Sequence, residues 1–260
     1  MFRRILVPVP MENVPELALK RAGEMAKRFG SRIFVHYIIQ SEVFDLVQEQ
    51  STHVITEGRQ EDLFKEMSDI HRTRAEKSIL PDVKSILGRK PDGFSVKEGE
   101  FHDQVLESIE ELKAELVLME YHHFSLLKYK IMDRSPVPIW IERNSGNIKK
   151  IGLFCSNLAP NEISPKAAKK LAREFDAKLY PYFIQDPASY IDEEEPAELA
   201  DEKGLKWREV VNKRLDDFIY RKARKRDFDL IIIGRMKKRG YFHLRSKFAK
   251  RTHCSVLMVN

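Results

Sequence analysis

The residues best suited to bind a ligand are the basic and glycine residues of one stretch near the C-terminus. Between Arg221 and Arg251 the sequence contains 13 lysines and arginines but only two aspartates. This stretch has a formal charge of +11, so the rest of the chain carries −5 within a total of +6. Such concentrated positive charge favours an anionic partner. Three interpretations stay open: a solvated basic surface, a phosphate-type ligand or acidic protein, and a nucleic acid.

Part of this stretch follows an apolar segment, residues 229–233, that is short enough to be a buried strand. The carboxyl ends of parallel strands form the usual ligand crevice of open α/β sheets, and backbone N–H groups near glycines bind phosphate there. A second apolar strand, residues 151–155, ends beside a serine hydroxyl. The candidate ligand-binding residues therefore share strand ends: Ser156, Gly234, Arg235, Lys237, Lys238 and Gly240. No nucleic-acid-binding motif is recognisable, which argues against a nucleic-acid partner.

Catalytic and metal-binding patterns are absent from the sequence. It contains no Ser-His-Asp arrangement, nucleophile elbow or metal-hydrolase motif. His36, His122 and His123 lie near predicted strand ends, but only Glu120 accompanies them at a ligand-like spacing. We expect these histidines to be packed or solvated. The sequence thus predicts no catalytic residue, no metal site, no bound cofactor and no enzymatic activity.

Composition places the chain among proteins of the cytoplasm. Its 260 residues are 42% hydrophobic and 33% charged, enough for one large domain or two ordinary ones. No apolar run approaches the ~18 residues of a membrane span, and the apolar start is too short for a signal peptide. The only cysteines, Cys155 and Cys254, lie in apolar segments. We expect them to be buried and reduced.

The chain repeats one pattern of strands and helices. The first copy begins with a strand at 5–9, a helix and a strand at 32–39, and the same pattern returns 146 residues later. Asn13 and Gly30 are predicted to begin and end the first helix. The second halves of the two copies align at a shift of 114 residues. They comprise strands at 94–97 and 208–211, helices at 102–113 and 214–226, strands at 115–119 and 229–233, and last strands at 138–141 and 255–259. The second copy is therefore 32 residues shorter in its middle.

This alternation predicts an α/β fold of two tandem doubly wound domains, residues 1–145 and 146–260. Each would be a five-stranded parallel sheet with helices on both faces. The first copy is predicted to insert a long helix, about 57–79, where the second has an acidic, proline-containing loop, 186–204. The last strands, 138–141 and 255–259, are predicted to pair with each other in an intrachain pseudo-dimer, because unpaired edges favour pairing.

These residues resemble the universal stress protein family in its tandem form, of the HUP-like α/β class. The resemblance covers nearly the whole chain. It is carried by Ile-Leu-Val-Pro-Val at 5–9, Ala-x2-Met-Ala-x2-Phe at 22–29, Leu-Ile-Ile-Ile-Gly at 230–234 and the strand at 254–259. It implies a non-catalytic cytoplasmic protein of stress response or regulation that pairs through its last strands. Some members of the family bind ATP.

The resemblance also implies that the ATP site is degenerate. The family's aspartate after the first strand is replaced by Pro10 in the first domain and Ser156 in the second. Its glycine-rich phosphate loop is replaced by a segment starting at Glu120 in the first domain. In the second domain Gly234 keeps the first glycine position, but Lys237 occupies the next. An enzyme of the related adenine-nucleotide hydrolase-like folds is disfavoured for the same reason.

The function implied is therefore a non-catalytic regulatory or interaction module. The alternative is a nucleotide- or phosphate-binding sensor that uses only the second domain, with weak binding. The expected partners are a second copy of the chain and a regulatory protein of unknown identity, with no membrane.

Overall fold

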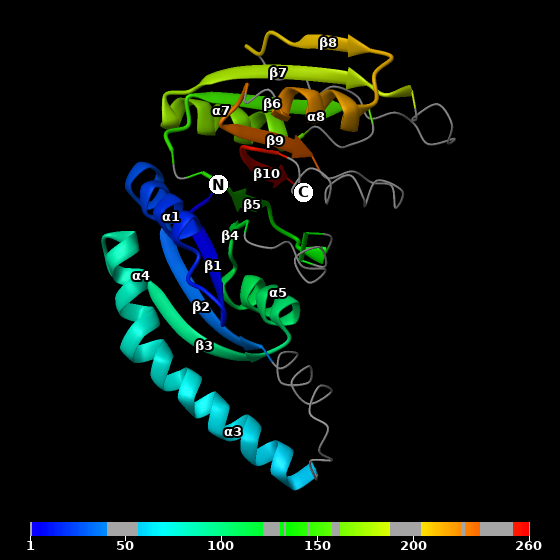
Figure 1. Ribbon diagram of the computed structural model, residues 1–260. Helices are drawn as coiled ribbons and strands as arrows, with labels where there is room; N and C mark the ends of the chain where they lie inside the picture. The colour runs from blue at the N-terminus through cyan, green and yellow to red at the C-terminus, as the bar shows by residue number, and fades with distance from the viewer. Residues whose placement is uncertain are drawn as a thin grey trace. The chain divides into compact units, whose positions relative to one another are not determined.

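The computed structural model describes residues 2–40, 57–121, 131–132, 134–144, 146–157, 162–187, 204–224, 227–234 and 252–259. They form two compact units, Phe2–Leu118 and Met119–Asn260 (Figure 1). Strands alternate with helices in both units, as the predicted α/β fold requires. The predicted repeat boundary after residue 145 stays a prediction, whereas the compact units divide within the strand Leu116–Glu120.

The N-terminal unit has a parallel sheet in the order β3-β2-β1-β4. Its elements are β1 Arg4–Pro10, α1 Glu16–Phe29, β2 Arg32–Gln40, α3 Glu57–Arg74, the π-helical turn Ala75–Ile79, α4 Leu80–Leu87, β3 Gly93–Gly99, α5 Phe101–Leu112 and β4 Leu116–Glu120. Helices α1 and α4 lie on one side of the strands and α5 on the other (Figure 1). The long helix predicted at 57–79 is present and continues through α4.

Helix α1 shows how the sequence fixes the local structure. Its buried residues, among them Ala18, Ala22 and Met25, recur at helical spacing and face the sheet. Gly30 ends the helix at φ 65°, a left-handed conformation that glycine adopts without a steric cost, and its N–H donates to the Ala26 carbonyl at 3.0 Å. The start of helix α1 differs from the prediction. Helix α1 begins at Glu16 without a side-chain cap, so Asn13 is not the cap.

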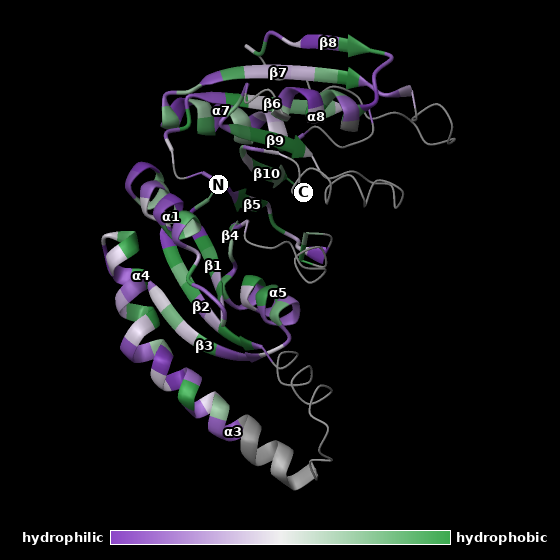
Figure 2. Ribbon diagram, in the orientation of Figure 1, coloured by the Kyte–Doolittle hydropathy of each residue, from purple (hydrophilic) through white to green (hydrophobic). Residues whose placement is uncertain are grey.

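The C-terminal unit has the strand order β5-β10-β9-β6-β7-β8. Its elements are β5 Ile139–Glu142, β6 Lys150–Ser156, α7 Ser164–Phe175, β7 Lys178–Gln185, β8 Arg208–Val211, α8 Leu215–Arg224, β9 Leu230–Gly234 and β10 Ser255–Val259. Every pairing from β10 to β8 is parallel. The inner strand β9 is hydrophobic along its length (Figure 2), as a strand covered on both faces requires. Most of the loop predicted at 186–204 lies outside the described residues.

Strands β5 and β10 pair antiparallel, which confirms the pairing predicted for the last strand of each copy. Trp140 lies opposite Leu257, with Ile141 opposite Val256. In the strand order, β5 lies between β4 and β10. Trp140 is fully buried and its ring lies 6.4 Å from that of Phe175 on α7.

A buried carboxylate holds this pairing. Glu142, at the end of β5, is fully buried and accepts hydrogen bonds from Trp140 Nε1 at 3.0 Å and from the backbone N–H of Asn144 at 3.1 Å. It also accepts a short hydrogen bond from the hydroxyl of Ser255 on β10. A carboxylate buried in this way is tolerated because its oxygens are satisfied by donors.

We predict that Glu142→Ala lowers the free energy of unfolding by about 3 kcal/mol or more, because three donors, two of them buried, lose their acceptor. Ser255→Ala removes only one partner and should cost about 1 kcal/mol. Denaturant melts of the full chain measure both, with the exposed Glu209→Ala as the matched control. Equal stability of the Glu142 and Glu209 variants would contradict the role given to the carboxylate.

The two cysteines lie on β6 and beside the start of β10, with β9 between these strands. Both are free and buried, as predicted. Burial raises the pKa of each thiol to about 12, so the reactive thiolate is scarce at neutral pH.

We therefore predict that Cys155 and Cys254 react with an aromatic disulfide reagent at least tenfold more slowly in the native protein than in denaturant, where two thiols should titrate without prior reduction. Absorbance of the released thiolate at pH 8 measures the rate. Fewer than two thiols in unreduced, denatured protein would show a disulfide.

Candidate functional site

The carboxyl ends of β6 and β9 bring two of the predicted site residues to one edge of the C-terminal unit's sheet. The strands are neighbours, with Phe154 opposite Ile233, so Ser156 and Gly234 close adjacent strands. Ser156 is buried. The other predicted site residues, Arg235, Lys237, Lys238 and Gly240, lie outside the described residues.

Next to Ser156, a reciprocal amide pair joins the ends of β6 and β7. The side chain of Asn157 donates to the carbonyl of Asp186 at 3.2 Å and accepts from its N–H at 2.9 Å. The buried carboxylate of Asp186 accepts from the Leu215 N–H at 2.7 Å, where α8 begins. An anion at this position satisfies a helix N-terminal donor and suits the helix dipole. The carboxylate of Asp186 therefore has a structural hydrogen-bond partner.

Sequence reasoning missed this pair. Asn157 and Asp186 are 29 residues apart and meet only because β6 and β7 are parallel neighbours. The available signal was a polar residue directly after each of two consecutive buried strands.

In the N-terminal unit, the ends of β1 and β2 are filled by the chain's own side chains. Met11, after Pro10, is buried and its sulfur lies 3.0 Å from the Gln40 backbone nitrogen. The Gln40 amide donates to Glu12 at 3.0 Å, and Arg74 of α3 donates to the Met11 carbonyl at 3.3 Å. These contacts occupy the strand ends where a doubly wound sheet usually admits a ligand. Glu120, which ends β4, is itself buried.

His36 is a packed histidine, in agreement with the sequence interpretation. Its Nδ1 lies 2.7 Å from the hydroxyl of Ser108 on α5. That hydroxyl donates its single proton to the Gln104 carbonyl at 2.6 Å, so Nδ1 is the donor to Ser108. The histidine therefore does not act as a base toward this serine, which is fully buried. His122 and His123 lie outside the described residues.

Burial, and next the charge of Lys97, lower the pKa of His36 from 6.5 to about 4. Between these values the unfolded state binds a proton that the folded state does not, so stability is lost as pH falls from 6.5 toward 4. The loss is on the order of 3 kcal/mol at about 1.4 kcal/mol per pKa unit.

We predict that His36→Leu combined with Ser108→Ala flattens the stability profile between pH 6.5 and 4. Denaturant melts across this range measure it, with the exposed His253→Gln as the control that keeps the slope. An unchanged slope in the double variant would assign the acid sensitivity to other groups.

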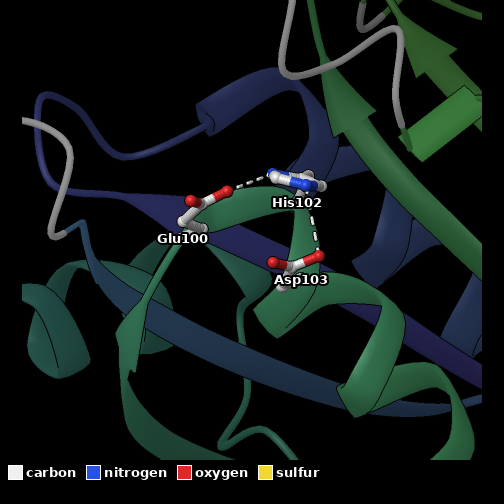
Figure 3. Close-up of side chains that lie close together, drawn as sticks. All are labelled: Glu100, His102 and Asp103. Carbon is white, nitrogen blue, oxygen red and sulfur yellow. Dashed lines mark ion pairs between the residues drawn. The ribbon is translucent and has the colours of Figure 1, made fainter.

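A cluster of one histidine and two carboxylates lies where β3 leads into α5 (Figure 3). Nδ1 of His102 is 3.3 Å from Glu100 and Nε2 is 3.1 Å from Asp103, and His102 is only 3% exposed. Within the described part of the chain, Nδ1 of His102 forms no hydrogen bond. Its contact with Glu100 is close enough for an ion pair but lacks hydrogen-bond geometry.

Sequence reasoning did not single out this cluster, although Glu-x-His-Asp at a helix start was its visible signal. The two carboxylates lie against opposite nitrogens of one ring (Figure 3). A single metal ion takes one imidazole nitrogen, so this arrangement fits acid–imidazole contacts better than a metal site.

The described residues thus define a pair of doubly wound α/β units whose strand ends are occupied mainly by mutually bonded side chains. No family model matches the chain, and no curated protein matches it. Among solved structures, it is similar to a universal stress protein from Archaeoglobus fulgidus DSM 4304, with 13% identity and a TM-score of 0.63, covering 98% of this chain and 96% of that one.

A putative universal stress protein from Pseudomonas aeruginosa UCBPP-PA14 is similar with 15% identity and a TM-score of 0.61, covering 99% of this chain and 93% of that one. The chain therefore has the fold of universal stress protein structures along its whole length, which confirms the predicted fold. None of the helices among the described residues is long and apolar enough to cross a membrane.

Proposed function

We propose that this protein is a non-catalytic, cytoplasmic regulatory module of the universal stress protein type, with degenerate nucleotide-binding sites. The observation that carries the proposal is the occupation of the strand ends. Met11, Gln40 and Arg74 fill them in the N-terminal unit, and Asn157 and Asp186 bond to each other in the C-terminal one. The shared fold supports the type of protein, since fold alone does not determine function.

Pro10 strengthens the proposal for the N-terminal unit. A proline side chain offers no acceptor for a nucleotide, and the neighbouring Met11 is buried in the space beyond β1. In the C-terminal unit Ser156 offers only a buried hydroxyl in place of the family's aspartate. Neither position supplies the carboxylate that the ATP-binding members use.

Deletion of the encoding gene tests the regulatory role. Unstressed growth should be unchanged, and survival of starvation, heat or oxidant should fall and be restored by the wild-type gene. The purified protein should release no stoichiometric nucleotide to mass spectrometry and should not hydrolyse ATP. Unchanged survival in every condition, or turnover of ATP, would overturn the proposal.

A second candidate function is a phosphate- or nucleotide-binding sensor in the C-terminal unit. It is favoured by one observation: Ser156 and Gly234 end adjacent strands, at the edge where such sheets bind phosphate. The sequence adds the charges of Arg235, Lys237 and Lys238 directly after Gly234.

For this candidate we predict weak binding of polyphosphate or nucleotide, with little preference among adenine, guanine and uracil. It should weaken with salt, because the Debye length falls from about 10 Å at 0.1 M to about 3 Å at 1 M. Calorimetry measures this binding. The binding at the crevice should be lost in the Lys237→Glu/Lys238→Glu variant and unchanged in Glu120→Gln. Tight, ATP-selective binding that resists salt would contradict a degenerate site.

A further inference from the structure

The C-terminal unit has a pocket at the end of its sheet opposite to the crevice described above. The pocket has a volume of about 520 Å³ and lies where β7 begins, between α7 and the segment that leads into β8. Its lining includes Lys178 and Tyr180 at the start of β7, whereas the crevice lies where β6 and β9 end. A volume in the range of about 300 to 1,000 Å³ is that of small-molecule sites.

The pocket is lined by four cationic side chains and, among the described residues, by no acidic one. Lys169 comes from α7, Lys178 begins β7, and Lys206 and Arg208 lie before and at the start of β8. Like charges gathered at one pocket repel each other, and a bound anion removes that repulsion. The charge therefore selects for an anionic ligand.

An aromatic ring, rather than a carboxylate, positions two of these cations. Lys178 Nζ and Arg208 Cζ each lie 5.4 Å from the centre of the Tyr180 ring. Arg208 also donates to the Tyr182 hydroxyl at 3.3 Å. Cation–π contacts orient a charged group without neutralising it. Within the described part of the chain, Lys178, Lys206 and Arg208 form no ion pair with a carboxylate, so their charge is available to a ligand.

We propose that this pocket binds a small polyvalent phosphate, of the chemistry of inorganic triphosphate. Several cations at one pocket match several negative charges on one ligand, and lysine and arginine both form charge-assisted hydrogen bonds with phosphate oxygens. The Tyr180 ring already carries two cations, so recognition rests on the phosphates rather than on stacking of a base. The site is independent of Gly234 and the basic residues that follow it.

Calorimetric titration of inorganic triphosphate into the full chain at low salt tests this site. The Lys237→Glu/Lys238→Glu background removes the charges near the crevice and should still bind. In that background, Lys178→Gln and Arg208→Gln should each weaken binding roughly tenfold, and the two together should abolish it. Lys213→Gln, an exposed lysine of the same unit outside the pocket, should change affinity less than twofold.

A second measurement needs no pocket variant, so it tests the proposal even if those variants fold poorly. In the wild-type protein, triphosphate should protect Lys169, Lys178 and Lys206 from acylation by a lysine-reactive reagent, and leave Lys213 unprotected. If triphosphate does not bind in the Lys237→Glu/Lys238→Glu background, the proposed pocket site is wrong, whatever the crevice binds. Equal protection of Lys213 would also overturn it, because it would show only diffuse attraction to a basic surface.

Discussion

The buried carboxylate of Glu142 constrains how β5 and β10 pair in the C-terminal unit. It lies at the end of β5 and accepts from Trp140 on the same strand and from Ser255 on β10. A buried charge is unfavourable unless donors satisfy it, and the Ser255 donor reaches the carboxylate only when the two strands are antiparallel and in this register. The interaction therefore specifies a pairing that hydrophobic contact alone leaves free to slip.

Regular elements were predictable because their signals are local. The last strand is observed at Ser255–Val259, where the apolar segment predicted it, and the helix predicted at 57–79 is present as α3 and the π-helical turn. Buried strands and helix faces follow from periodicity within a few residues. Gly30 ends α1 for the same reason, since its role depends only on its own backbone.

The contacts that fill the strand ends were not predictable in the same way. Asn157 meets Asp186 across 29 residues, and Arg74 reaches Met11 across 63. Both contacts depend on which strands become neighbours, and that order is a tertiary property. The pocket beside Tyr180 has the same origin, because its cations come from α7, β7, β8 and the segment before β8. The prediction that Asn13 caps α1 was wrong for a different reason. Asparagine is common in ordinary turns as well as at helix caps, so its presence alone does not locate a helix start.

The pairing of β5 with β10 has a consequence for how the chain folds during synthesis. The donor and acceptor of the Ser255–Glu142 bond are 113 residues apart. At about 5 to 20 residues per second, β5 is synthesised roughly 6 to 23 s before its partner strand. During that interval the edge of β5 that pairs with β10 lacks its native partner. The C-terminal unit therefore completes its sheet only after β10 has been translated.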